Sequence, residues 1–391
     1  MNILFVCGFF ETTLESFREN QISRRLAQRG HTVTVVTSTE SHVWKFGRQR
    51  HRITDPDGNL SRYADTPNLK IVRRKPTFRA GDLVMFPLHK SDFAGIDVVH
   101  VLDFRQGITA AAARLAASLR IPVVYDHEQR GDRRGHLLHA VDNYVRRSLI
   151  KHGAKGATLV RHTVDANLEF LLSVTQHIKP EQCHLAPLGA DEHIFFQDAG
   201  LRKATRGLYG LSDHERLIVC TGRFSSEKRP VDVARATANA NCKLYFCGSV
   251  PENIANELKD WPHASLLGPK SQKEVNALYN AADCALFTTF TLSYWEALAT
   301  GCPIIVPNTT FSQKIRGQCQ GVHLFGAPEM FLVSEEQYQP GFDLTEPISK
   351  TLETFDWARL DTPPAWVSWD SRITEVEAQY ASILSPSAPG Q

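Results

Sequence analysis

Short apolar strands alternate with helical segments along this chain, and the alternation runs through the sequence twice. The first series comprises expected strands at 3–7, 31–37, 98–102, 122–125 and 157–160, with expected helices at 14–29 and 108–119. The second series comprises strands at 217–221, 243–247, 284–288 and 303–306, with helices at 230–240, 272–282 and 292–300. Strands that alternate with helices form parallel sheets with both faces covered. We therefore expect an α/β protein with two doubly wound, Rossmann-like sheets.

The length of 391 residues fits two domains of ordinary size. A polar stretch at 197–206 separates the two series, so we place the boundary near residues 192–212. This predicts an N-terminal domain over residues 1–192 and a C-terminal domain over residues 210–366. In doubly wound sheets, ligands bind beyond the carboxyl ends of the strands, and two such sheets in tandem predict a shared crevice.

Composition excludes several classes of protein. Hydrophobic residues make up 42% and charged residues 22%, which is typical of a globular chain. No apolar run approaches the roughly 20 residues of a membrane span. Residues 1–7 lack a basic segment and a cleavage site, so we interpret them as a buried strand instead of a signal peptide. The eight cysteines are scattered with no C-x-x-C pair, which favours buried thiols in a reducing compartment and a cytoplasmic location.

Charge is unevenly distributed along the chain. Residues 1–190 contain 27 Lys and Arg against 18 Asp and Glu, a net charge of +9, whereas the remaining 17 basic and 24 acidic residues give −7. The basic clusters are Lys45, Arg48, Arg50 and Arg52; Arg73, Arg74, Lys75 and Arg79; and Arg130, Arg133, Arg134, Arg146 and Arg147. Such clusters suit an anionic lipid surface or a phosphorylated substrate, and they equally suit a solvated surface.

The first segment that suggests chemistry follows the expected strand 217–221. Gly222 permits close backbone approach, and Arg223 and Lys228 lie in the loop that leads into the next helix. A helix N-terminus attracts anions, Arg binds phosphate in a bidentate manner and Lys adds a point charge. The segment therefore predicts a diphosphate site, with an ordinary solvated loop as the alternative.

The second segment follows the expected strand 284–288. Glu296 falls early in a helix, where the helix dipole favours a carboxylate that could accept hydrogen bonds from ribose hydroxyls. Backbone N–H groups near Thr291 and Leu292 could meet phosphate. The alternative for Glu296 is simple helix capping.

Together, these two segments resemble the retaining GT-B glycosyltransferases of the glycosyl transferases group 1 class, a family 4-like group. The family loop G-R-x-x-x-x-K is matched by Gly222, Arg223 and Lys228, and the later E-A-x-x-x-G-x-P by Glu296, Ala297, Gly301 and Pro303. The resemblance extends over nearly the whole chain. Residues 266–268 and 278–283 are similar to the base-binding turn and its following helix, residues 186–191 to an interdomain element, and residues 366–384 to a C-terminal return to the first domain.

The resemblance implies roles for further residues. His127 is similar to the family histidine that contacts the donor sugar, and Gly8 is what remains of a glycine-rich loop after the first strand. We predict His127, Arg223, Lys228 and Glu296 as catalytic residues. The predicted donor-binding residues are Gly8, Gly222, Gly248, Leu267, Gly268, Thr288, Thr291 and Leu292.

One position departs from the family pattern. The first Glu of the family's paired-glutamate motif, which contacts the transferred sugar in relatives, is Thr288 here, and the glycines after it are Thr289 and Thr291. A threonine can form a hydrogen bond but carries no charge. The departure puts the donor sugar, and activity itself, in question.

We expect no metal and no cofactor. Asp55 and Asp57 form a D-x-D sequence, but they lie in a Pro-Asp-Gly turn, which favours a turn. His127 stands beside Asp126 and Glu128, and so small a cluster rarely holds a metal.

The predicted reaction moves a sugar from a nucleoside diphosphate to an acceptor hydroxyl, through a transition state with oxocarbenium character. The resemblance implies retention of configuration without a protein nucleophile. Expected partners are a nucleotide-sugar donor, a glycan, lipid-linked or small-molecule acceptor, and an anionic membrane at its inner face, with no nucleic acid. Two alternatives are a non-catalytic GT-B partner protein and a nucleotide-sugar epimerase, and the latter would need acid and base carboxylates that the sequence does not reveal.

Overall fold

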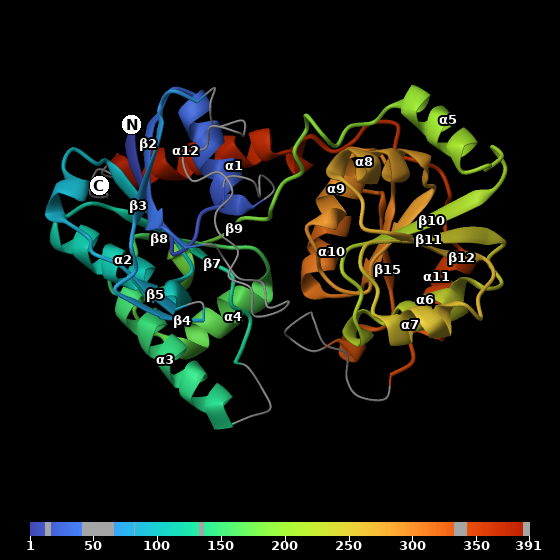
Figure 1. Ribbon diagram of the computed structural model, residues 1–391, viewed down its shortest axis with the longest axis horizontal. Helices are drawn as coiled ribbons and strands as arrows, with labels where there is room; N and C mark the ends of the chain where they lie inside the picture. The colour runs from blue at the N-terminus through green and yellow to red at the C-terminus, as the bar shows by residue number, and fades with distance from the viewer. Residues whose placement is uncertain (12–16, 41–65, 82, 133–136, 332–341, 386–391) are drawn as a thin grey trace, which may run out of the picture. The chain divides into compact units, whose positions relative to one another are not determined.

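A computed structural model describes residues 1–11, 17–40, 66–81, 83–132, 137–331 and 342–385 of the chain. The chain divides into two compact units (Figure 1). Unit 1 contains Met1–Pro187 and Arg372–Gln391, and unit 2 contains Leu188–Ser371. Each unit is described here by itself.

Unit 1 is built on a seven-stranded sheet in the order β3-β2-β1-β6-β7-β8-β9, in which every neighbouring pair is parallel. The strands are β1 (Asn2–Val6), β2 (Thr32–Ser38), β3 (Leu69–Arg74), β6 (Val98–Leu102), β7 (Val123–His127), β8 (Leu159–His162) and β9 (Cys183–Leu185), with a separate antiparallel pair, β4 (Phe78–Ala80) and β5 (Leu83–Met85). The helices are α1 (Arg18–Gln28), α2 (Ile108–Ser118), α3 (Leu137–Ala154), α4 (Asp165–Val174) and α12 (Trp369–Leu384), which belongs to unit 1 from Arg372 onward; short 3-10 turns are η1 (Lys90–Phe93), η2 (Phe104–Gln106) and η3 (Pro180–Gln182).

A buried charge cluster fastens the C-terminal helix to this sheet. Neighbouring strands β6, β7 and β8 contribute His100, Asp126 and Arg161, all almost fully buried. Asp126 lies 3.1 Å from the His100 imidazole and 3.2 Å from the Arg161 guanidinium. The other ring nitrogen of His100 lies 2.6 Å from the Tyr380 hydroxyl of α12. Each buried charge thus has a partner, as burial requires.

Unit 2 is built on a six-stranded parallel sheet in the order β12-β11-β10-β13-β14-β15. The strands are β10 (Arg216–Thr221), β11 (Cys242–Cys247), β12 (Ala264–Gly268), β13 (Cys284–Leu286), β14 (Ile304–Pro307) and β15 (Val322–Phe325). The helices are α5 (Ala199–Leu208), α6 (Pro230–Thr237), α7 (Glu252–Leu258), α8 (Gln272–Ala281), α9 (Ser293–Ala299), α10 (Thr310–Arg316) and α11 (Thr345–Glu353), with 3-10 turns η4 (Ser226–Lys228), η5 (Pro328–Met330) and η6 (Ala365–Val367).

Helices α8, α9 and α10 lie over one face of this sheet, and α6, α7 and α11 lie over the other (Figure 1). Numbered along the chain, its strands follow the doubly wound order 3-2-1-4-5-6, which reverses direction between β10 and β13. Ligands bind beyond the strand ends at such a reversal. The topology therefore directs attention to the loops after β10 and β13.

Two expectations from the sequence need correction. Residues 197–206 were expected as a polar connection, but most of them belong to α5, whose Arg202 and Arg206 pair with Asp283 at 2.5 and 3.3 Å. Helix α5 is part of unit 2, and the division between the units falls earlier, after Pro187. Strand β7 was expected to end at residue 125, but it continues to His127, because its backbone still pairs there with β6 and β8.

Candidate functional site

Three glycines end three adjacent strands of unit 2. Gly222, Gly248 and Gly268 follow or end β10, β11 and β12, and all have positive φ angles, of 116°, 143° and 68°. The Gly222 N–H donates to the Cys247 carbonyl at 3.0 Å, and the Gly248 N–H donates to the Gly268 carbonyl at 2.9 Å. A Cβ on Gly248 would lie 1.8 Å from the Gly222 carbonyl oxygen. The chain turns so closely here that no side chain fits at Gly248.

The Gly222 loop carries the two predicted phosphate-binding residues. Arg223 is exposed and Lys228 is partly buried. The Lys228 ammonium would lie 3.0 Å from a Cβ on Gly222, so this lysine folds back over the glycine. Arg229, with a φ of 49°, then turns the chain into α6, which begins with Pro230.

A hydrogen bond joins this loop to the loop after β13. The Thr288 hydroxyl donates to the Lys228 carbonyl at 2.7 Å. Thr221, Lys228, Thr288 and Thr291 share the lining of a cavity of about 20 Å³, which has room for about one water molecule. The predicted residues on both sides of the strand reversal are therefore neighbours.

A chain of polar groups, of which Thr221 and Tyr279 are buried and Ser293 and Glu296 half-buried, joins β10 to α9. The Thr221 hydroxyl lies 2.5 Å from the Tyr279 hydroxyl of α8, and Tyr279 also hydrogen-bonds the Ser293 side chain. Ser293 in turn hydrogen-bonds Glu296. Burial raises the pKa of the Glu296 carboxyl to about 7, and this hydrogen bond lowers it in part. Glu296, the fourth residue of α9, is thus linked to the residues that end β10.

The remaining predicted residues of unit 2 fall beside these. Leu267 is the penultimate residue of β12 and is partly buried, and Gly268 ends that strand. Leu292 is the N-cap of α9 in helical conformation, and Thr291 precedes it. The structure therefore brings Gly222, Lys228, Gly248, Gly268, Thr288 and Glu296 to one edge of the unit 2 sheet.

Gly8 and His127 lie in unit 1, at the carboxyl ends of β1 and β7. The Gly8 N–H donates to the Gln106 side-chain oxygen at 2.6 Å, and a Cβ on Gly8 would lie 2.4 Å from Val84. Close packing against β5 therefore requires a glycine at this position.

His127 is completely buried. Burial, followed by the charges of Arg105 and His162, lowers the pKa of His127 to about 3, so the ring is neutral. Its Nδ1 lies 2.5 Å from the Tyr125 hydroxyl, and its Nε2 has no hydrogen-bond partner in the described part of the chain.

Sequence reasoning missed Tyr279, Ser293 and Tyr125. Tyr125 stands two residues before His127, and residues at that spacing share one face of a strand. That spacing was the available signal. Tyr279 offered none, because its partners are far away in the sequence.

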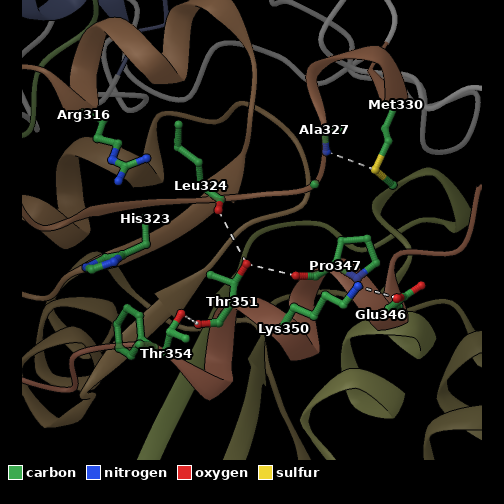
Figure 2. A pocket seen from close by; sticks show the side chains of 12 residues that line it. Arg316, His323, Leu324, Ala327, Met330, Glu346, Pro347, Lys350, Thr351 and Thr354 are labelled. Carbon is green, nitrogen blue, oxygen red and sulfur yellow. Dashed lines mark hydrogen bonds and ion pairs between the residues drawn. The ribbon is translucent and has the colours of Figure 1, made fainter.

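A larger cavity of about 500 Å³ lies away from all of these residues (Figure 2). Strand β15 and helix α11 form much of its wall, through His323, Leu324, Pro347, Lys350 and Thr351. Lys350 pairs with Glu346 across one turn of α11, at 2.6 Å. The cavity contains none of the predicted site residues.

Several other predictions concern regions that the structure describes only in part. Lys45, Arg48, Arg50, Arg52, Asp55, Asp57, Arg133 and Arg134 lie outside the described residues. Arg74, Arg146 and Arg147 of the basic clusters pair with Asp92, Asp142 and Asp132. Over the described ranges, no group of three or more His, Cys, Asp or Glu side chains could hold a metal ion, and no helix is long and apolar enough to cross a membrane.

Comparison with protein families locates a match in unit 2. The family model described as "Glycosyl transferases group 1" matches residues 202–318, which contain the Gly222 loop, Thr288 and Glu296. No curated protein matches the chain.

Solved structures extend the similarity beyond residues 202–318. A sucrose-phosphate synthase from Thermosynechococcus elongatus has a TM-score of 0.66 at 17% identity, covering 99% of this chain and 100% of that one. Anabaena HepE in complex with UDP has a TM-score of 0.63 at 13% identity, covering 98% and 100%. A putative UDP-N-acetylglucosamine 2-epimerase from Listeria monocytogenes has a TM-score of 0.51 at 12% identity, covering 100% and 98%. The chain therefore has the GT-B fold of two Rossmann-like domains.

Proposed function

We propose that this chain is a glycosyltransferase that moves a sugar from a nucleoside-diphosphate sugar to an acceptor hydroxyl, with retention of configuration and without a metal. The observation that carries the proposal is the convergence of the Gly222–Lys228 loop and Glu296 at the strand reversal of the unit 2 sheet. Anabaena HepE, which has the same fold, is described in complex with UDP. The proposed donor therefore suits both the fold and the residues.

Positive charge and backbone geometry account for the proposed leaving-group site. Departure of a nucleoside diphosphate places negative charge on its phosphate oxygens. Arg223 and Lys228 supply two cations beside a glycine that lets the backbone come close. Fixed charges of this kind stabilise a developing anion without reorganisation. In this proposal they take the place of a metal ion.

Glu296 is the proposed ribose ligand. An ionised carboxylate accepts hydrogen bonds from two neighbouring hydroxyls. The Thr221–Tyr279–Ser293 chain holds Glu296 in place and links the residues that end β10 to those that start α9. Such positioning is a large part of what an enzyme contributes to group transfer. In the proposed reaction, His127 contacts the transferred sugar.

Thr288 bears on the alternative of a non-catalytic partner protein. The Thr288 hydroxyl donates its proton to the Lys228 carbonyl, so this residue joins the loops after β10 and β13 and presents no charge. The putative epimerase from Listeria monocytogenes has the same fold, which supports the epimerase as an alternative. Both alternatives predict nucleotide binding without net sugar transfer, or no nucleotide binding at all.

The experiment that tests the proposal is thermal stabilisation by UDP, GDP, ADP and their sugars. A ligand that binds only the native state raises its stability by mass action, by about 2.7 kcal/mol at a hundredfold excess over Kd. We expect one nucleotide series to stabilise the protein and the Arg223→Ala, Lys228→Ala variant to lose the effect. The matched control is Arg235→Ala, Lys259→Ala, which removes two cations elsewhere in unit 2 and should respond like the wild type. No stabilisation by any nucleotide would contradict the proposal.

We also propose that the protein is cytoplasmic and contacts an anionic membrane through α3. All eight cysteines are free thiols, which suits a reducing compartment. Helix α3 exposes Val141 by 59% and Tyr144 by 77%, and the exposed Lys151 lies two turns further along. Apolar and aromatic side chains beside lysine are typical of surfaces that bind at a bilayer interface. This surface would bring the enzyme to a lipid-linked acceptor.

Sedimentation with lipid vesicles tests this surface. We expect binding to vesicles that contain phosphatidylglycerol and weak binding to pure phosphatidylcholine. Val141→Ser, Tyr144→Ser should reduce the binding, whereas Leu208→Ser, which changes an 80% exposed leucine of unit 2, should leave it intact. Equal sedimentation of all three proteins would show that α3 is not the contact.

A further inference from the structure

The cavity of about 500 Å³ lies along the outer edge of the unit 2 sheet (Figure 2). Strand β15 is the last strand of that sheet, and α10 and α11 cover opposite faces beside it. The volume lies within the range of about 300–1,000 Å³ that small-molecule sites occupy. All lining residues fall at positions 316–355, whereas the loops after β10 and β13 come earlier in the chain. The cavity is therefore separate from the proposed donor site.

Two basic side chains line this cavity without a partner of their own. Arg316 is the last residue of α10 and is exposed, and His323 is the second residue of β15 and is half-buried. Among the residues that the structure describes, Arg316 has no ion-pair partner and neither ring nitrogen of His323 has a hydrogen-bond partner. Figure 2 shows both side chains on the same side of the cavity. Their donors are thus available to an anion.

The other charged residues that line the cavity neutralise each other. Lys350 pairs with Glu346 at 2.6 Å, one turn apart on α11, and Figure 2 shows this pair on the side away from Arg316. The positive charge that remains therefore belongs to the side of Arg316. Apolar side chains of Leu324 and Pro347 form part of the wall between the two sides. The cavity thus combines an anion-binding side with an apolar wall and a polar pair.

The edge of β15 suits a small molecule better than a peptide. Extended peptides bind an edge strand through its outward backbone groups. The Asn308 N–H donates to the Phe325 carbonyl, so the carbonyl of the preceding Leu324 points away from β14. The Thr351 hydroxyl of α11 lies 3.5 Å from that carbonyl. Helix α11 therefore occupies the position that an added strand would take.

We propose that this cavity is a second ligand site, which binds a small organic phosphate monoester with its phosphate at Arg316 and His323. Arginine binds phosphate oxygens in a bidentate manner. A monoester carries a charge of about −1.5 to −2 near pH 7 and three terminal oxygens, which serve a guanidinium and an imidazole on different elements. The organic part lies against Leu324 and Pro347. A nucleotide sugar has no terminal phosphate, so the donor is a different ligand.

A bound phosphate should also change the state of His323. Burial, followed by the charge of Arg316, lowers the pKa of His323, and Asp356 raises it in part. The ring lies against Phe355, with centroids 4.5 Å apart. An anion beside the imidazole favours its protonated form, so binding should raise the pKa of His323.

Titration calorimetry on the full chain tests the proposal with five probes: glucose 6-phosphate, ribose 5-phosphate, glycerol 3-phosphate, inorganic phosphate and glucose. We expect at least one of the three monoesters to bind, inorganic phosphate to bind more weakly and glucose not to bind. Arg316→Gln should lower the affinity for the monoester by about tenfold or more, because it removes charge-assisted hydrogen bonds. The His323 signal in spectra of labelled histidine, identified by its absence in His323→Gln, should report a raised pKa in the complex.

The matched control is Lys314→Gln. Lys314 is an exposed cation of the same helix, α10, and does not belong to the residues that line the cavity. This variant should bind the monoester like the wild type. The midpoint of thermal unfolding without ligand shows that each variant is folded, and we expect little change in Arg316→Gln because this side chain is exposed.

Failure of all three monoesters to bind, or equal affinity in Arg316→Gln and the wild type, would overturn the proposal. Equal affinity for inorganic phosphate and the best monoester would overturn the assignment to an organic ligand. An oligoglutamate peptide that binds at this edge in place of the monoesters would overturn it in favour of a peptide site. The Arg223→Ala, Lys228→Ala variant should keep the binding of the monoester, so failure of this site and failure of the donor site are distinguishable.

Discussion

Replacing Gly248 by alanine is expected to destabilise unit 2 strongly, because β10 and β11 end too close together for a side chain. The new Cβ would lie 1.8 Å from the Gly222 carbonyl oxygen, where real contacts do not fall below 3.0 Å, so the strand ends must separate by more than 1 Å. A φ of 143° adds strain of about 1–3 kcal/mol for any residue other than glycine.

Separation also weakens two hydrogen bonds, from Gly222 to Cys247 at 3.0 Å and from Phe224 to Ser249 at 2.9 Å. At about 1 kcal/mol each, these bring the expected loss in the free energy of unfolding to about 4 kcal/mol. The same separation displaces Lys228, so donor binding should fall as well.

The matched control is Gly210→Ala. Gly210 also has a positive φ, of 64°, but a Cβ there meets nothing within 4 Å. Only the backbone strain remains, about 1–2 kcal/mol. The two variants should therefore differ by about 2–3 kcal/mol.

Urea unfolding followed by tryptophan fluorescence measures this difference. Five of the six tryptophans, Trp261, Trp295, Trp357, Trp366 and Trp369, lie in unit 2, so the signal reports mainly on that unit. Free energies of unfolding that agree within about 0.5 kcal/mol for the two variants would refute the close approach of the strand ends.

Three further changes probe charged groups. Glu296→Gln should stabilise the protein by up to about 3 kcal/mol at pH 8 and by less at pH 5. The pKa of Glu296 in the folded protein, about 7, lies above its value in the unfolded chain, so the ionised carboxylate opposes folding increasingly as the pH rises. Urea unfolding at both pH values measures this difference. Asp126→Asn should cost about 3–5 kcal/mol near pH 7. Burial alone would raise the pKa of Asp126, but neighbouring cations, Arg161 first among them, hold this pKa below its usual range. The destabilisation by Asp126→Asn should therefore become smaller as the pH falls below about 4. Arg206→Ala should cost about 1–3 kcal/mol, because the Ala281, Ser212 and Glu215 carbonyls lose their donor while Asp283 keeps Arg202, and a midpoint of thermal unfolding like that of the wild type would contradict this.

The sequence predicts the parts of the fold that depend on local pattern. Strand β1 shows this, since every residue from Ile3 to Val6 is apolar and fully buried. The end of β7 and helix α5 could not be predicted in this way. Asp126 and Arg206 are typical surface residues in a sequence, and they are buried here only because their partners come from other elements.

The candidate site also has parts that follow from local sequence pattern and parts that depend on distant segments. A glycine with two cations and a helical glutamate can be found by motif, and the structure brings Gly222, Lys228 and Glu296 to one sheet edge. The groups that hold them, Tyr279 and Ser293, are invisible without the fold, because hydrogen bonds between distant segments leave no spacing rule. A role for Thr288 in closing the loop likewise appears only from its bond to Lys228.

Hydrogen exchange of the backbone, measured with and without the stabilising nucleotide sugar, tests the central claim most directly because it locates the donor. The account predicts slower exchange in residues 222–228 and 288–296, where the loops after β10 and β13 meet, and unchanged exchange in residues 322–330 and 345–355 around the cavity of Figure 2. Slower exchange confined to β15 and α11, with none in the two loops, would contradict the account and move the nucleotide site to that cavity.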